Sequence, residues 1–239
     1  MKRISLVSLI TCLALTVHAQ VSSTRKPISL DSNSVVKDST GRVLAFSEWQ
    51  PIIASGMYTL KFRKPAKNDS VEYTLFPLSD DQIDFRMSIM PQPRESKFFK
   101  TGEKISNFYA DDMNGKGFKL KKLEGKVVVL NFWFIGCPPC RMEIPELNKI
   151  AKAYANDPDV VFISFGLDGY RDIKNYISYV PFTYHIVYDA RPYADAYHIN
   201  LYPTNVVLDK EGKVRFHSSG YATNLPYWIR KTIEECKKY

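Results

Sequence analysis

Two cysteines three residues apart, Cys137 and Cys140, lie where one sequence pattern gives way to another. The apolar run Val127–Phe134 precedes them and predicts a buried strand. The residues after them repeat apolar side chains every three or four positions and predict a helix (Ile144, Leu147, Ile150, Ala151 and Tyr154). Cys140 then falls in the first helical turn, where free backbone amides and the helix dipole favour an anion. This setting favours a thiolate, so the pair is predicted to be a redox site.

A structural zinc site can use the same Cys-x-x-Cys spacing, but it needs two further ligands at a suitable distance in the chain. The remaining candidates form no second pair (Cys236, His185, His198 and His217). Cys236 also continues the apolar stripe of a predicted final helix, which indicates a small buried side chain. We therefore expect no metal and no cofactor.

The first 19 residues have the pattern of an export signal. Lys2 and Arg3 are followed by the apolar stretch Ile4–Val17, and small Ala19 precedes the expected cleavage point. An apolar stretch of about 14 residues is short for a membrane span, which needs roughly 20. We expect cleavage after Ala19 and a periplasmic protein, with an uncleaved, membrane-anchored form as the alternative.

Export decides how the cysteines are interpreted, because disulfides persist outside the cytoplasm. The mature chain keeps one close pair and one odd cysteine, which is not a structural disulfide framework. Loss of two cations with the signal lowers the formal net charge from +8 to +6. That charge is dispersed along the chain and follows no nucleic-acid-binding pattern, so no nucleic-acid partner is expected.

Residues 20–95 are predicted to form a small α+β module of unknown role. Met57–Phe62 and Val71–Phe76 are expected as strands around the turn Lys64–Asp69. Ser79 is expected to cap a helix, with Gln82 as its capping-box partner.

Residues 96–239 alternate strands and helices, which predicts an α/β domain with a mostly parallel sheet. Strands are expected at 108–110, 118–120, 127–132, 160–165, 184–187, 205–208 and 214–217. Helices are expected at 139–156, 171–179, 193–197 and 224–237. The last two strands form a hairpin around Asp209–Gly212, which makes the sheet mixed. This order is that of a thioredoxin-like mixed sheet flanked by helices.

Two motifs carry a family resemblance. Phe-Trp-x-x-x-Cys-x-Pro-Cys, ending at Cys140, together with the distant Tyr202-Pro203-Thr204, resembles the thioredoxin superfamily. Asn131 before the Phe-Trp pair and Glu143 after the cysteines are closer to the exported TlpA-like thiol–disulfide oxidoreductases. The likeness spans about residues 100–239 and does not include residues 20–95.

The resemblance implies roles for the cysteines and for a nearby acid. Cys137 would be the more exposed, attacking thiol and Cys140 the buried, resolving thiol, and the two would form a Cys137–Cys140 disulfide. Glu143 lies one helical turn beyond Cys140, and partial burial would make it a proton acceptor. The alternative is a surface glutamate stabilised by the helix dipole.

The resemblance also implies a substrate-binding edge. Pro203, with a cis peptide bond, would lie against the dithiol, and Tyr202 and Thr204 beside it would expose backbone for pairing with a substrate peptide. A trans turn proline is the alternative. Trp133 would pack beneath the site and restrict access to it. Gly136 stands where many thioredoxins carry a second tryptophan, which predicts a more open pocket.

The residues between the cysteines predict the direction of the reaction. Pro138 and Pro139 have no N–H to donate to the Cys137 thiolate, and no histidine lies between the cysteines to add charge. A less stabilised thiolate makes a more reducing couple. We therefore expect a reductase that acts on cysteines of other exported proteins, with apocytochromes c among the candidates. Its electrons would come from a membrane thiol-transfer protein.

Three other functions compete with this interpretation. A thiol peroxidase needs Thr or Ser three residues before its reactive cysteine, where this chain has Phe134. A copper-delivery module would have Cys-x-x-x-Cys spacing and a nearby histidine. A non-catalytic protein could use the thioredoxin-like unit as a scaffold and bind partners through its N-terminal module.

Overall fold

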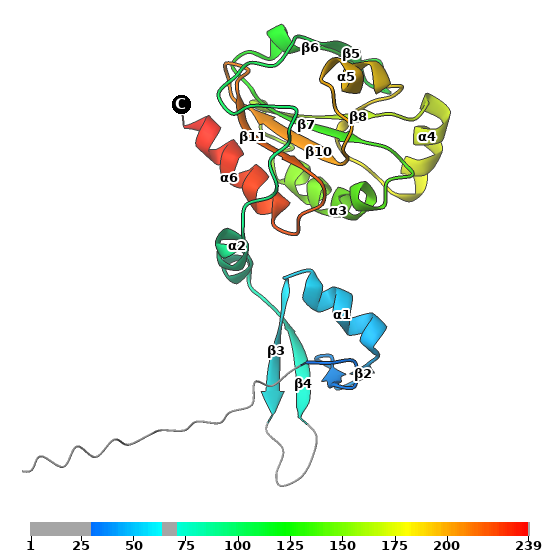
Figure 1. The fold of residues 1–239 in the computed structure, drawn as a ribbon, viewed down its shortest axis with the longest axis vertical. Coiled ribbons are helices and arrows are strands. Elements are labelled where there is room, and N and C mark those ends of the chain that lie inside the picture. The colour runs from blue at the N-terminus through cyan, green and yellow to red at the C-terminus, as the bar shows by residue number, and fades with distance from the viewer. Residues whose placement is uncertain (1–29, 64–70, 239) are drawn as a thin grey trace, which may run out of the picture.

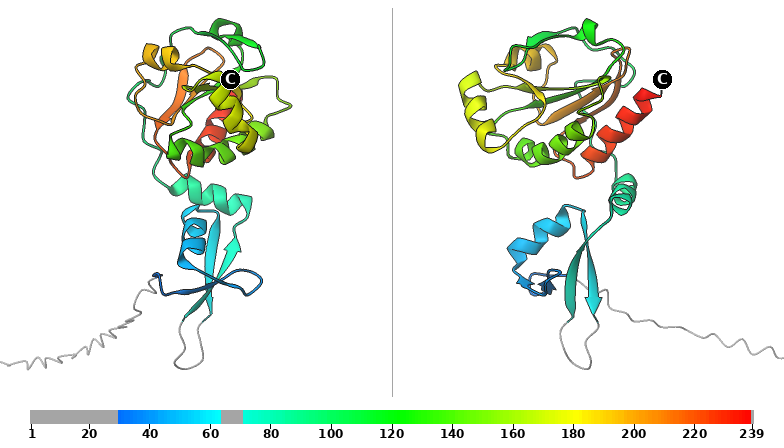
Figure 2. Two further views of the ribbon diagram at one scale, coloured as in Figure 1. Left: turned by 90° about the vertical axis from the view of Figure 1, so that its right-hand side faces the viewer. Right: turned by 180° about the vertical axis from the view of Figure 1, so that it is seen from behind.

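The computed structural model describes residues 30–63 and 71–238 (Figure 1). The expected export signal, residues 1–19, and the expected turn Lys64–Asp69 lie outside the described residues. Two bodies are visible, a small one from the N-terminal module and a larger one that carries the cysteines, with helix α2 between them (Figures 1 and 2).

The small body is a four-stranded sheet with one covering helix. The strand order is β2 (Val43–Leu44), β1 (Val35–Lys37), β4 (Glu72–Pro77), β3 (Tyr58–Arg63). Strand β1 is parallel to β4, and the other two pairings are antiparallel. Trp49 of helix α1 (Phe46–Ala54) is buried in the core of this body. The strands predicted at Met57–Phe62 and Val71–Phe76 are confirmed as β3 and β4. Helix α1 and strands β1 and β2 were not predicted.

Helix α2 (Asp80–Ile89) begins as the sequence predicts. The Gln82 backbone N–H donates to Ser79 Oγ at 3.4 Å, and the Ser79 N–H donates to Gln82 Oε1 at 3.1 Å, which completes a capping box. The helix packs against α6 of the larger body, where Arg230 pairs with Asp84. The α2 helix is therefore docked on the larger body.

The larger body is built on a five-stranded sheet in the order β11-β10-β7-β8-β9. Strands β7 (Val127–Trp133), β8 (Val160–Gly166) and β9 (His185–Val187) are parallel. Strands β10 (Thr204–Leu208) and β11 (Val214–Ser219) run antiparallel to their neighbours. All seven residues of β7 are buried, because helices cover both faces of the sheet.

Helices cover each face of this sheet. Helices α3 (Pro138–Ala153), α4 (Tyr170–Tyr179) and α6 (Leu225–Lys237) pack on one face. Helix α5 (Arg191–Ala196) packs on the other, together with the hairpin β5 (Tyr109–Asp111) and β6 (Gly117–Lys119) and the 3₁₀ helix at Leu120–Leu123 (Figure 2). The predicted thioredoxin-like mixed sheet is confirmed, and each predicted element of this body is present within a few residues of its expected bounds.

Candidate active site

The two cysteines lie at the start of helix α3, directly after the central strand β7. Cys137 is the N-cap residue of the helix and Cys140 lies in its first turn, as the sequence predicts. A disulfide joins them, with an S–S distance of 2.06 Å. The Cys140 backbone N–H donates to Cys137 Sγ at 3.2 Å. Cys137 is 3% exposed and Cys140 0%, so the pair differs little in exposure and is nearly covered.

An aromatic pair packs against the apolar cluster that contains the two cysteines. The Phe134 ring meets Tyr202 edge-to-face with 5.4 Å between ring centroids. A Cβ atom built at Gly136 would lie 3.6 Å from Phe134, so this ring fills the space beside the glycine. The Ile135 N–H donates to Asp168 Oδ2 at 2.7 Å and fixes the loop. The more open pocket that we expected at Gly136 stays a prediction, since Gly136 is exposed and meets the Phe134 ring only in ordinary contact.

The segment after helix α5 supplies a cis-proline beside the same loop. The Tyr202–Pro203 peptide bond is cis. The Tyr202 hydroxyl donates to the Ile199 carbonyl at 3.0 Å, and the Thr204 hydroxyl donates to the Leu201 carbonyl at 2.7 Å. The Thr204 side chain is buried and supports the loop from within. Substrate binding at residues 202–204 stays a prediction, and only Tyr202 of the three is partly exposed, because Pro203 and Thr204 are buried.

Trp133 lies in the core beside the disulfide. It is fully buried in the same apolar cluster as both cysteines, and it packs on Tyr176 and Phe182 at centroid distances of 5.7 and 5.6 Å. Gly166 on the neighbouring strand makes room for Ile173, since an added Cβ would lie 2.6 Å from Ile173 Cδ1 and in ordinary contact with the Trp133 indole. Trp133 therefore supports the site from below and is not itself open to a substrate.

Glu143 is a buried acid one helical turn beyond Cys140. Its side chain accepts hydrogen bonds from Asn131 Nδ2 at 2.8 Å and from Asn205 Nδ2 at 3.2 Å. Burial raises the pKa of Glu143 from 4.5 to about 8, although both hydrogen bonds oppose this shift. The alternative of a surface glutamate is wrong, because Glu143 is 3% exposed. Such an acid can take up or release a proton near neutral pH.

Asn205 was missed by sequence reasoning, although a signal for it exists. Asn131 is the polar residue in an otherwise apolar strand, and Asn205 begins a second run of the same kind. The structure pairs Asn205 directly with Asn131 across β7 and β10. A polar residue inside a doubly covered strand needs a partner, so two such residues indicate a shared buried polar site.

Comparisons with known proteins agree with this geometry. The AhpC/TSA family profile matches residues 101–217. The thiol-disulfide oxidoreductase ResA of Halalkalibacterium halodurans is 30% identical over 123 residues, which cover 51% of this chain and 70% of the relative. This chain belongs to the thioredoxin-like thiol–disulfide oxidoreductases. It is therefore an enzyme of this class.

Two further similarities fit the family. The thioredoxin-like protein YneN of Bacillus subtilis is 29% identical and is covered over 68% of its length. A solved thiol:disulfide interchange protein from Bacteroides sp. is 26% identical, with a TM-score of 0.50, and covers 57% of this oxidoreductase and 92% of that chain. The family profile begins at residue 101, so the N-terminal module lies outside it.

The described part of this oxidoreductase has no helix that is long and apolar enough to cross a membrane.

Proposed function

We propose that this oxidoreductase is an exported reductase that opens disulfides in other exported proteins. The observation that carries the proposal is the placement of Glu143. A proton acceptor with a pKa of about 8 lies in the core one turn beyond Cys140, on the helix that begins at the disulfide. A buried acid at this position serves a reaction in which a buried thiol must lose its proton.

The proposed reaction starts from the reduced enzyme. The Cys137 thiolate attacks one sulfur of a substrate disulfide, a bond forms between them, and the other substrate sulfur leaves as a thiolate that takes a proton from water. Cys140 then gives its proton to the Glu143 carboxylate and attacks Cys137 Sγ. The mixed disulfide breaks, the second substrate sulfur leaves as a thiolate that takes a proton from water, and the Cys137–Cys140 bond forms. Two electrons pass from the enzyme dithiol to the substrate.

The direction of electron flow rests on the amides around Cys137. Pro138 and Pro139 supply no N–H, and the Cys140 N–H donates to Cys137 Sγ at 3.2 Å. With this limited support for a thiolate, we expect a reduction potential near that of thioredoxin, about −270 mV. A potential near about −120 mV, as in DsbA-type oxidants, contradicts the proposal.

Location and partners are proposed from the sequence. The signal-like residues 1–19 support export to the periplasm, where substrates would be exported cysteine-containing proteins, apocytochromes c among them. A reductase in an oxidising compartment needs a continuous supply of electrons, so we propose a membrane thiol protein as the donor. Phe134 occupies the position where a peroxidase needs a hydroxyl, which disfavours the peroxidase alternative.

The test combines turnover with trapping. Wild-type protein is expected to reduce insulin in the presence of dithiothreitol, and Cys137→Ala to lose this activity. Cys140→Ala is expected to accumulate mixed disulfides with its substrates through Cys137, and mass spectrometry of these adducts identifies them.

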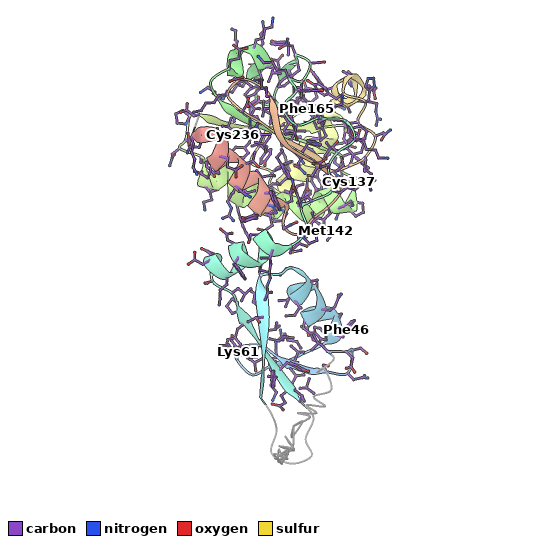
Figure 3. The ribbon with its side chains drawn as sticks, turned by 60° about the vertical axis from the view of Figure 1, so that its left-hand side comes forward. Phe46, Lys61, Cys137, Met142, Phe165 and Cys236 are labelled. Atoms are coloured by element: carbon purple, nitrogen blue, oxygen red, sulfur yellow. A yellow bond between two sulfur atoms is a disulfide. The ribbon has the colours of Figure 1, made fainter. Side chains whose placement is uncertain are left out.

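Cys236→Ala is the matched control, because this free thiol is buried in α6, away from Cys137 (Figure 3). It should keep wild-type activity. Equal insulin reduction by wild type and Cys137→Ala, or none by either, favours the non-catalytic scaffold.

A further inference from the structure

A row of four polar side chains crosses the middle of the central sheet. Ser164 on β8 pairs in register with Asn131 on β7, Asn131 pairs with Asn205 on β10, and Asn205 pairs with Ser218 on β11. Each is at most 1% exposed. Register partners project to the same face of a sheet, and their neighbours two residues away pack against α3 and α6, so the row lies under these helices.

Burying amides in this position is unfavourable unless they are hydrogen-bonded. The two central members of the row bond to each other and to Glu143, which projects from α3 onto them. Asn131 Nδ2 donates both to Glu143 Oε1 at 2.8 Å and to Asn205 Oδ1 at 2.9 Å. Asn205 Nδ2 donates to both carboxylate oxygens of Glu143 at 3.2 Å.

The bond between the two amides fixes their orientation. Because Asn205 Oδ1 accepts from Asn131, the Asn205 side chain must turn its NH₂ group toward Glu143. The pair therefore presents two donors to the carboxylate. Donors stabilise the ionised form of an acid, so the arrangement suits a carboxylate that must hold a negative charge in the core.

We propose that Asn131 and Asn205 are positioning residues, a pair of coupled amides that orients the Glu143 carboxylate and stabilises its ionised form so that it can accept the Cys140 proton. This inference rests on the proposed role of Glu143. It adds that the ability of Glu143 to act depends on amide side chains from two strands that are far apart in the sequence.

The other groups around Glu143 offer no replacement for the amides. Tyr184, just before β9, is buried close enough for the two groups to interact electrostatically, and burial together with the Glu143 charge raises its pKa. Cys140, on the same helix, carries the proton to be transferred. Among the described residues, no lysine or arginine contributes to the pKa of Glu143. The two amides therefore provide the hydrogen bonds that stabilise the Glu143 carboxylate and oppose the rise in its pKa caused by burial.

The first test measures the ionisation of Glu143 in the oxidised protein, where no turnover is needed. Infrared difference spectra between pH 5 and 10 follow its carboxyl band, which Glu143→Gln identifies by removing it. Asn131→Leu and Asn205→Leu, which keep approximate volume and remove the donor, should each raise the midpoint by about one pH unit or more. Asn131→Asp, a change of nearly identical size, should also raise it, because it removes the donor and places a second acid beside Glu143.

Ser164→Ala and Ser218→Ala are the matched controls. Both serines lie in the same buried row, and the structure gives neither hydroxyl a hydrogen bond to Glu143. They should leave the midpoint unchanged. Unshifted midpoints in folded asparagine variants, or equal shifts in the serine variants, overturn the proposal. If both leucine variants fail to fold, Asn131→Ala and Asn205→Ala, which remove the donor without adding a charge, decide the question.

The second test follows the pH dependence of the resolving step. Rapid mixing of reduced enzyme with a disulfide peptide gives the rate at which the mixed disulfide resolves. We expect its pH midpoint to rise with the infrared midpoint in the asparagine variants. If the infrared midpoint shifts and the pH midpoint of the resolving step does not, the amide pair still stabilises the Glu143 carboxylate. That result overturns the role of Glu143 as the proton acceptor. Failure of the inference and failure of the proposed function are thus separable.

Discussion

The buried Glu143 should make the stability of the oxidised protein depend on pH in a way that one substitution removes. Its pKa is about 8 in the folded protein, whereas the ordinary pKa of a glutamate, which applies to the unfolded chain, is 4.5. Between these values the folded state holds a proton that the unfolded state has lost. Stability conferred by the neutral acid is therefore complete below about pH 4.5 and is lost as pH rises towards 8.

The size of the effect follows from the same two values. Each unit of difference in pKa corresponds to about 1.4 kcal/mol, so the free energy of unfolding should fall by up to about 5 kcal/mol between pH 4.5 and pH 8 on account of Glu143. Glu143→Gln removes the ionisation and keeps an oxygen that can accept from Asn131 and Asn205. The variant should therefore gain stability relative to wild type as pH rises.

The assay is urea unfolding of the oxidised protein at a series of pH values from 5 to 9. Other titrating groups contribute equally to wild type and variant, so the difference between them isolates Glu143. Glu146→Gln is the matched control on the same helix, because its carboxylate reaches solvent and bonds to Lys149 Nζ at 2.7 Å. A difference between wild type and Glu143→Gln that is constant across this range refutes the argument.

Three further predictions test packing around the site. Phe134→Ala should speed alkylation of reduced Cys137 by iodoacetamide several-fold, because it removes a ring that packs against the apolar cluster containing Cys137. An unchanged rate would argue against this shielding. Gly166→Ala should lower the free energy of unfolding in urea by about 1–3 kcal/mol, because the added Cβ would lie 2.6 Å from an isoleucine side chain. Gly136→Ala is the control, because its Cβ would meet only ordinary contacts and the variant should unfold like wild type. Asn224→Ala removes the donor to two backbone carbonyls of the α2 region, so it should lower the free energy of unfolding by about 1–2 kcal/mol and speed proteolysis of the α2 region. Proteolysis at the wild-type rate would contradict this docking contact.

The larger body could be predicted from sequence because its signals are local. Val127–Trp133 is apolar except at Asn131, and the residues after Cys140 repeat at helical spacing, so strand and helix follow from these local patterns. The capping box at Ser79 is equally local and was confirmed. The cysteine pair could be placed at the start of a helix for the same reason.

Other features depend on contacts that local patterns do not contain. Helix α1 was missed because Pro51 lies within it and Trp49 is its one buried residue, so it lacks a clear apolar stripe. The pairing of Asn131 with Asn205 depends on which distant strands become neighbours. The position of the Phe134 ring over Gly136 depends on a side-chain rotamer, which no spacing rule predicts.

The docking of α2 on α6 has a consequence for any protein that binds the N-terminal module. Asn224 and Arg230 of the larger body hold the α2 region by side-chain bonds, so the two bodies are connected by more than a flexible peptide. A bound protein would then be held in the same complex as the dithiol, and its encounter with the dithiol would depend on this fixed geometry rather than on its concentration in solution. Weak affinity for the module would be enough to decide which disulfides this enzyme encounters first.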